Sequence, residues 1–129
     1  MFDGIEVFRM ANLLAIHSSA RQAEIAANVA NADTPGYRAR DVAPFSEFYD
    51  SRAGDAPLRA TRPGHLGADR PDAAALARVD TPDAAAPNGN TVSLEAEMMK
   101  AVEVQFSHET ALSVYESARN ILRTSLGRK

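Results

Sequence analysis

The chain has 129 residues, which is enough for one domain. Its 14 basic and 17 acidic residues give a formal net charge of −3, a balance that argues against a nucleic-acid-binding protein with a strongly basic face. No cysteine is present, so a disulfide framework, a thiolate zinc site and cysteine catalysis are excluded. Aromatic residues make up only 6% of the chain and alanine supplies much of its apolar content. We therefore expect a thin core that assembly with other chains would complete.

Targeting signals are not evident in the first residues. Asp3 and Glu6 are acidic, and no basic leader precedes an apolar run, so this stretch does not resemble a cleavable secretory signal. The longest apolar runs fall far below the roughly 20 residues that cross a bilayer. By ordinary rules we expect a cytoplasmic protein, unless it leaves by a route that needs no such leader.

Helix-breaking residues divide the chain into three parts. All seven prolines and five of the seven glycines lie between residues 35 and 89. The predicted fold class is mainly α, with two long terminal helices that form a coiled-coil-like pair and an irregular, Pro/Gly-rich middle segment. The predicted boundaries are residues 1–37 for the N-terminal helix and turn, 38–90 for the middle segment, and 91–129 for the C-terminal helix.

The N-terminal part has apolar residues at steps of mostly three and four, which predicts a helix from about residue 4 to residue 31. The large side chains expected to pack along it are Ile5, Phe8, Leu13 and Ile16. Alanines line the second half of the same side, so a partner helix could approach closely there.

In the C-terminal part, Ser93 is the expected N-cap, and Glu95, Glu97 and Glu103 are interpreted as a solvated helix face. From Leu94 onward, alternating steps of four and three follow the spacing of a coiled-coil seam, which polar residues interrupt at three positions. The predicted seam residues are Leu94, Met98, Leu112, Tyr115, Leu122 and Leu126. Apolar residues on other sides indicate that this helix faces more than one neighbour.

The middle segment mixes arginines with acidic residues and contains few large apolar side chains. Its Ala-Pro and Pro-Asp stretches suit a mobile loop or a surface excursion. Short strands could form there in an assembly, but we do not expect them.

The most informative segment contains Asn28, Asn31, Asp33, Thr34, Pro35, Gly36 and Tyr37. Pro35 disfavours helix at the residue before it, and Pro-Gly at the centre of residues 34–37 fits a type II turn. By local chemistry alone this is a helix stop followed by a tight turn. Asn28 and Asn31 share one helix face, so their amides could also satisfy exposed carbonyls or set the register against another helix.

The pattern Asn-Val-Ala-Asn-x-x-Thr-Pro-Gly-Tyr at residues 28–37 resembles the N-terminal signature of the bacterial flagellar axial proteins of rod and hook. The continuation through residue 42 and the segment at residues 89–98 are similar to the proximal rod proteins of that family in particular. The resemblance covers both flanks and not the middle. Ser93 departs from the aspartate expected in the family, although both residues cap helices.

This resemblance implies a structural subunit of the flagellar basal-body proximal rod. Such subunits polymerise through their terminal helices to form part of the torque-transmitting driveshaft and export channel. The implied partners are copies of the chain, other rod proteins, membrane-ring and rod-base adaptor proteins, and the flagellar type III export apparatus. The implied location is the periplasmic part of the basal body, reached without a cleaved signal peptide.

Catalytic motifs are not evident in the sequence. His17, His65 and His108 lie far apart without metal-binding spacing, and no nucleophile-elbow, phosphate-binding or dinucleotide motif occurs. We expect no enzymatic activity, cofactor, metal, nucleic acid or small-molecule substrate. The alternatives are the other proximal rod subunit and, from a different class, a soluble helical adaptor or regulatory protein in the cytoplasm.

Overall fold

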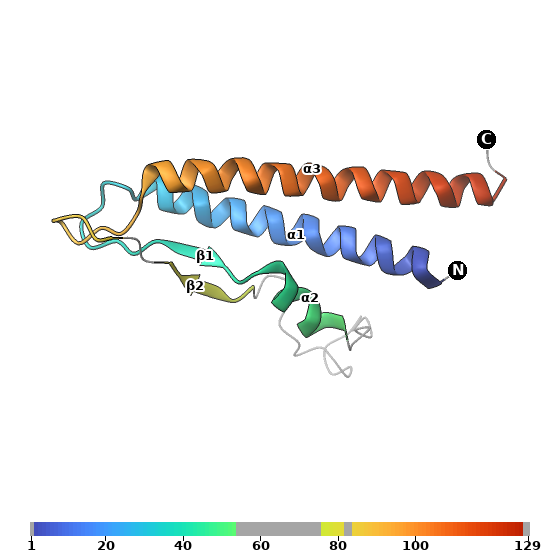
Figure 1. The fold of residues 1–129 in the computed structure, drawn as a ribbon, viewed down its shortest axis with the longest axis horizontal. Coiled ribbons are helices and arrows are strands. Elements are labelled where there is room, and N and C mark those ends of the chain that lie inside the picture. Colours follow the sequence, from blue (N-terminus) through green and yellow to red (C-terminus); the bar gives the residue numbers. More distant parts are fainter. Residues whose placement is uncertain (1, 54–75, 82–83, 128–129) are drawn as a thin grey trace, which may run out of the picture.

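The computed structural model describes residues 2–53, 76–81 and 84–127. Two long helices dominate it, α1 (Phe2–Ala30) and α3 (Leu94–Ser125). They lie side by side and antiparallel, with the start of α1 and the end of α3 at the same end of the molecule (Figure 1). The expected mainly α fold with two long terminal helices is therefore confirmed. No helix in the described ranges is both long and apolar enough to span a membrane.

Buried residues recur at seven-residue intervals on both long helices, which is the spacing of a coiled coil. They are Ala11, Ser18 and Ile25 on α1, and Glu97, Val104 and Ala111 on α3. Small side chains at Ala11, Ser18 and Ala111 let the two backbones approach closely. Ser93 caps α3 as expected, because its Oγ accepts a hydrogen bond from the Ala96 amide at 3.4 Å.

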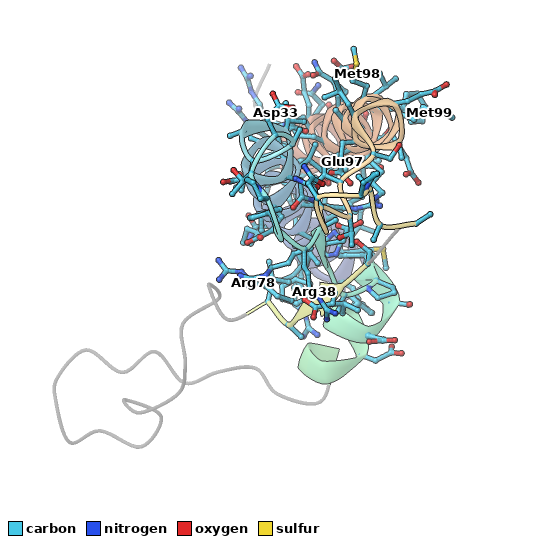
Figure 2. All side chains as sticks on the ribbon, turned by 90° about the vertical axis from the view of Figure 1, so that its left-hand side faces the viewer. Asp33, Arg38, Arg78, Glu97, Met98 and Met99 are labelled. Carbon is cyan, nitrogen blue, oxygen red and sulfur yellow. The ribbon has the colours of Figure 1, made fainter. Side chains whose placement is uncertain are left out.

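The contact between α3 and α1 runs along a different line from the predicted seam. Leu94, Met98, Leu112 and Leu126 are between 50% and 76% exposed. Figure 2 shows Met98 on the outer side of α3, whereas Glu97 points inward. The predicted seam was drawn through the apolar side chains of α3. The side of α3 that faces α1 instead begins with a polar residue. Packing of these four residues against neighbouring molecules stays a prediction.

Two other predicted seam residues, Phe8 and Tyr115, meet between α1 and α3. The Phe8 and Tyr115 rings meet edge to face, with centroids 5.1 Å apart. Leu13 is buried, Ile16 is half-buried, and Leu122 is 41% exposed. The side chain of Ile5 lies outside the described residues.

The middle segment contains elements that we did not expect. Strand β1 (Arg40–Val42) pairs antiparallel with β2 (Arg78–Asp80), and a short helix, α2 (Phe45–Ala53), follows β1. The expectation of no strands was wrong because each strand has only three residues, too few for a periodic pattern. Phe45, Phe48 and Tyr49 have helical spacing and could have indicated α2.

Helix α2 packs on α1 through the buried His17. The His17 Nε2 lies 2.8 Å from the Ala43 carbonyl oxygen and donates to it. The imidazole centroid lies 5.6 Å from the Phe45 ring and 5.9 Å from the Phe48 ring. His17 is thus a packed, hydrogen-bonded core residue.

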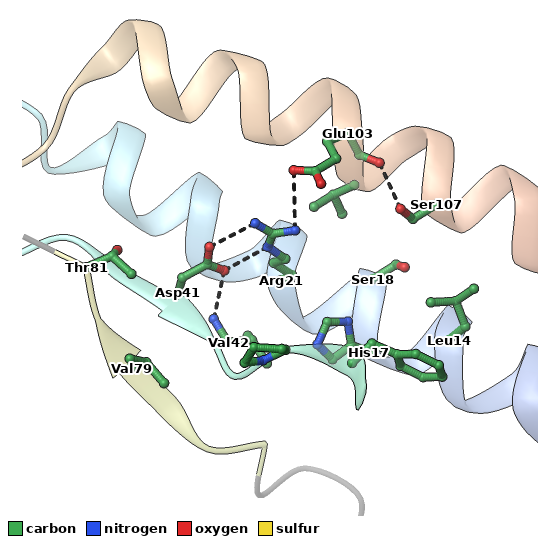
Figure 3. A pocket seen from close by; sticks show the side chains of 13 residues that line it. Leu14, His17, Ser18, Arg21, Asp41, Val42, Val79, Thr81, Glu103 and Ser107 are labelled. Atoms are coloured by element: carbon green, nitrogen blue, oxygen red, sulfur yellow. Dashed lines mark hydrogen bonds and ion pairs between the residues drawn. The ribbon is translucent and has the colours of Figure 1, made fainter. Parts of the chain in front are cut away.

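Arg21 joins the strand pair to α1. Its guanidinium binds the Asp41 carboxylate through two hydrogen bonds of 2.9 and 3.1 Å, and it lies 3.6 Å from the Glu103 carboxylate of α3 (Figure 3). The hydrogen bonds that Arg21 donates to the Asp41 carboxylate raise the pKa of Arg21 above its ordinary value, while burial opposes the rise. One cation therefore holds α1, β1 and α3 together beside a cleft of about 510 Å³.

This arrangement predicts that Arg21→Lys destabilises the fold, because an ammonium group cannot make the two parallel hydrogen bonds of a guanidinium. We expect the free energy of unfolding to fall by about 1–2 kcal/mol in urea denaturation followed by circular dichroism. Arg38→Lys, at an exposed position, is the matched control and should change stability by less than about 0.5 kcal/mol. Equal losses in the two variants would contradict the assignment.

Candidate functional site

Helix α1 ends in the tight turn that its sequence predicts. The Tyr37 amide donates to the Thr34 carbonyl at 3.3 Å, and Gly36 has a φ of 72°. A positive φ at the third residue is what a type II turn requires, and glycine adopts it without a steric penalty. Thr34 and Pro35 are exposed, so the turn forms the surface of the loop end. Asp33 is also exposed there.

Asn28 lies at the centre of this end of the molecule and has 0% exposure. Its Nδ2 donates to the Arg40 carbonyl at 2.6 Å and to Glu97 Oε2 at 3.0 Å. Its Oδ1 accepts from the Arg40 amide at 3.1 Å and from the Tyr37 hydroxyl at 3.3 Å. An amide side chain has two donor hydrogens and two acceptor positions, so Asn28 is fully satisfied. It links α1, β1 and α3 directly.

Glu97 is buried, with 1% exposure, which corrects our interpretation of it as part of a solvated helix face. Its two carboxylate oxygens have separate partners, because Oε1 accepts from Lys100 Nζ at 2.7 Å and Oε2 accepts from Asn28. A buried carboxylate requires such partners, since its desolvation is otherwise costly. The Asn28–Glu97 hydrogen bond joins residues 69 positions apart and fixes the axial position of α3 on α1.

Asn90 binds the turn that follows α1. Its Nδ2 lies 2.8–2.9 Å from the carbonyl oxygens of Asn31, Ala32 and Thr34. Its Oδ1 accepts from the Val92 amide at 2.7 Å, which also holds the chain leading into α3. These carbonyls belong to the turn that follows the end of α1 at Ala30, so a distant asparagine holds this turn in place. Asn31 instead donates its own Nδ2 to the Ala27 carbonyl at 2.8 Å.

Residues 88–91 also bind the turn through their backbone. The Gly36 amide donates to the Asn88 carbonyl at 3.0 Å, and the Thr91 amide donates to the Tyr37 carbonyl at 3.0 Å. The Thr91 Oγ1 accepts from the Ala39 amide at 2.9 Å. The backbones approach closely here, since a Cβ added at Gly89 would lie 3.5 Å from the Gly36 Cα.

The two segments with family resemblance, residues 28–37 and 89–98, therefore meet at one end of the helix pair. We call their interlocked polar side chains the signature cluster, which consists of Asn28, Tyr37, Asn90, Thr91 and Glu97. Its polar groups bind one another and the backbone, so the arrangement is suited to joining chain segments. In the described ranges, no three His, Asp or Glu side chains gather as a metal site would require.

Sequence reasoning identified part of this cluster. Asn28 hydrogen-bonds to Glu97 of the other long helix, and its role in setting the register of α1 against another helix stays a prediction. Asn90, Thr91 and Glu97 were missed as site residues, although the segment that contains them was noted for its resemblance. The available signal was an asparagine and a threonine directly after Gly89, because these side chains often bind a neighbouring backbone.

The cluster predicts that Asn28→Ala destabilises the chain. The Glu97 carboxylate loses one donor, and the Arg40 amide and Tyr37 hydroxyl lose their acceptor. We expect the free energy of unfolding in urea to fall by about 2–4 kcal/mol. The exposed asparagine Asn12 on the same helix provides the control, and Asn12→Ala should change stability by less than about 0.5 kcal/mol. A similar effect of both substitutions would argue against a special role for Asn28.

Comparison with known proteins gives consistent matches along the chain. A family model described as Flagella basal body rod protein matches residues 15–38, which include Asn28 and the following turn. The chain is 29% identical to the flagellar basal body rod protein FlgB of Agrobacterium fabrum over 127 residues, covering 96% of this chain and 95% of the relative.

Two enteric relatives extend this result. The chain is 35% identical over 106 residues to FlgB of Salmonella typhimurium, with 75% of each chain covered. It is 37% identical over 101 residues to FlgB of Escherichia coli, with 72% of each chain covered. The resemblance to rod proteins that the two terminal segments indicated is thereby confirmed. The chain belongs to the flagellar basal body rod protein family.

Proposed function

We propose that the chain is a structural subunit of the proximal rod and polymerises through its terminal helices to form part of the driveshaft and the export channel. The observation that carries this proposal is the signature cluster, which ties two long helices together at one end. A torque-transmitting subunit needs its helices held in a single register, and buried, mutually satisfied polar groups supply that specificity. The relatives' name, flagellar basal body rod protein FlgB, supports the same role.

The outer surfaces of the helix pair support assembly with other chains. Large apolar side chains on α3 stay exposed, among them Leu112 at 51% and Ile121 at 69%. Contiguous exposed apolar surface is typical of a protein–protein interface. The proposed partners are copies of this chain, other rod proteins, and the membrane-ring and rod-base adaptor proteins. The subunit would reach the periplasmic rod through the flagellar type III export apparatus.

The role is structural and involves no catalysis, cofactor, nucleic acid or small-molecule substrate. The two alternatives differ from it in location or neighbours. The other proximal rod subunit would occupy a different position in the same rod. A soluble helical adaptor or regulator would bind one partner helix in the cytoplasm. Neither alternative is favoured by the relatives' names, which refer to FlgB.

Cell fractionation separates the rod subunit from a cytoplasmic adaptor. We expect an epitope-tagged chain to co-purify with detergent-extracted basal bodies in the presence of salt. Cells that lack the type III export apparatus serve as the control, and in them the chain should stay in the cytosol. Recovery of the chain only from the cytosol of wild-type cells would contradict the proposal.

A second test concerns the seam residues. Leu112→Asp should block incorporation into basal bodies without changing expression, because a charge in an apolar contact is costly to desolvate. Since Leu112 is half exposed in the single chain, the isolated variant should keep the helix content of the parent in circular dichroism. The neighbouring exposed residue offers a control, Ser113→Asp, which adds the same charge and should keep motility. Normal motility of Leu112→Asp would contradict the seam assignment.

A further inference from the structure

The loop that leads into α3 contains the one Asn–Gly pair of the chain, at residues 88 and 89. Both residues are exposed, and the loop lies at the end of the helix pair away from the start of α1 and the end of α3 (Figure 1). A side-chain amide is lost most readily from an asparagine before glycine, because no Cβ obstructs attack by the next backbone nitrogen. Each of the other asparagines precedes a residue with a side chain.

Deamidation of this pair would need only water. The Gly89 backbone nitrogen attacks Asn88 Cγ, so a new N–Cγ bond closes a succinimide ring while the Cγ–Nδ2 bond breaks. Nδ2 leaves as ammonia and takes up the proton of the Gly89 N–H. Water then adds across one of the two ring C–N bonds. Opening at Cγ gives aspartate, and opening at the backbone carbonyl carbon gives isoaspartate, whose main chain runs through Cβ and Cγ.

The folded loop binds the attacking nitrogen. The Gly89 amide donates to the Ala86 carbonyl at 2.8 Å, and the Ala86 amide donates to the Asn90 carbonyl at 2.8 Å. With Pro87 as the second residue and a φ of 80° at Gly89, this is the pattern of a type I turn followed by a left-handed glycine. The nitrogen must lose its proton to attack, and its hydrogen bond to Ala86 opposes that loss.

The side chain that would be attacked is also held. Asn88 Oδ1 accepts from the Asn90 amide at 3.0 Å, and the Asn88 carbonyl accepts from the Gly36 amide at 3.0 Å. In a type I turn the residue before the glycine has a ψ of about 0°, which turns the next nitrogen away from that residue's own side chain. Ring closure therefore requires a rotation at Asn88 that breaks these contacts.

We propose that Asn88 is a deamidation site that the native fold keeps unreactive and that reacts when the loop opens or the chain unfolds. The signature cluster sets this protection, because the buried Asn90 holds the loop on the turn after α1 through three backbone carbonyls. Isoaspartate at position 88 adds one carbon to the main chain and moves the carbonyl that binds Gly36. The modified chain therefore loses the contact between the loop and the turn.

The first test follows deamidation of the purified full-length chain in slightly alkaline buffer, with and without a concentration of urea that unfolds it. Samples are digested at acidic pH, and fragment mass spectra distinguish residue 88 from residue 90. We expect deamidation of Asn88 in urea and a rate at least about tenfold lower without urea, because only open molecules react. Asn90, which precedes Thr91, is the internal control and should stay intact. Gly89→Ala should lose most of the reactivity in urea, where its effect on folding is irrelevant.

Two substitutions test whether the loop contacts give the protection. Asn90→Ala removes the anchor, so the rate at Asn88 without urea should rise about threefold or more, while the rate in urea stays the same. Pro87→Ala is milder, since it changes an exposed position and only frees the backbone of the turn, and it should act in the same direction. Asn12→Ala, at an exposed position of α1, is the control and should stay within about twofold of the parent.

The modified chain itself provides a test of the structural consequence. Chains with isoaspartate at position 88, formed in urea and then refolded, should exchange the amide hydrogens of residues 34–37 about tenfold faster than the parent. Asn88→Asp carries the same charge on an unaltered backbone, and its exchange should stay within about twofold of the parent.

The results decide the inference without reference to the rod, because all of them come from the isolated chain. Intact Asn88 in urea, equal rates with and without urea, unchanged rates in both loop variants, or parent-like exchange of the isoaspartate chain would each overturn it. Failure to find the chain in basal bodies would overturn the proposed function and leave this inference standing.

Discussion

The buried side-chain amide of Asn28 determines how the two ends of the chain meet. It has 0% exposure and binds the Arg40 backbone, the Tyr37 hydroxyl and the Glu97 carboxylate. A buried amide that lost any of these partners would carry an unsatisfied polar group. The turn after α1, the first strand and the start of α3 must therefore take up their positions together. The small side chains along the helix pair could tolerate other registers, but this hydrogen-bond network permits one.

The carboxylate of Glu97 occupies a buried position where an apolar contact would be more stable. Burying its carboxylate is costly, and the hydrogen bonds from Asn28 and Lys100 offset that cost without making the pair strongly stabilising. The benefit is specificity, because a helix that slipped by one turn would leave a buried charge unpaired. Such a constraint would suit the proposed rod subunit, whose outer surfaces would meet neighbours at defined positions.

The two sides of the helix pair differ in what they contact. One side of α1 holds the middle segment through the Arg21–Asp41 ion pair and the His17 contacts with α2. The outer side of α3 keeps large apolar residues exposed, with Val102 and Phe106 at 73% and 71%. The network at the loop end lets the chain hold its helices together without using those residues. In the proposed rod subunit these residues would be available for burial against other subunits, so a thin core would be compatible with assembly.

The sequence by itself determined the features that depend on neighbouring residues: the two long helices, the Ser93 cap, and the turn with Pro35 and Gly36, since helical periodicity, capping and turn chemistry are local. It also indicated the family through two short segments. Only the tertiary structure decided that those segments interlock, that Glu97 is buried, and that the helix contact runs through Val104 and not through Met98. The tertiary structure also decided the strand pair, because its three-residue strands are stabilised by partners far along the chain. Burial and register are properties of contacts between distant residues, and apolar spacing within one helix cannot reveal a polar side chain whose partners lie on another.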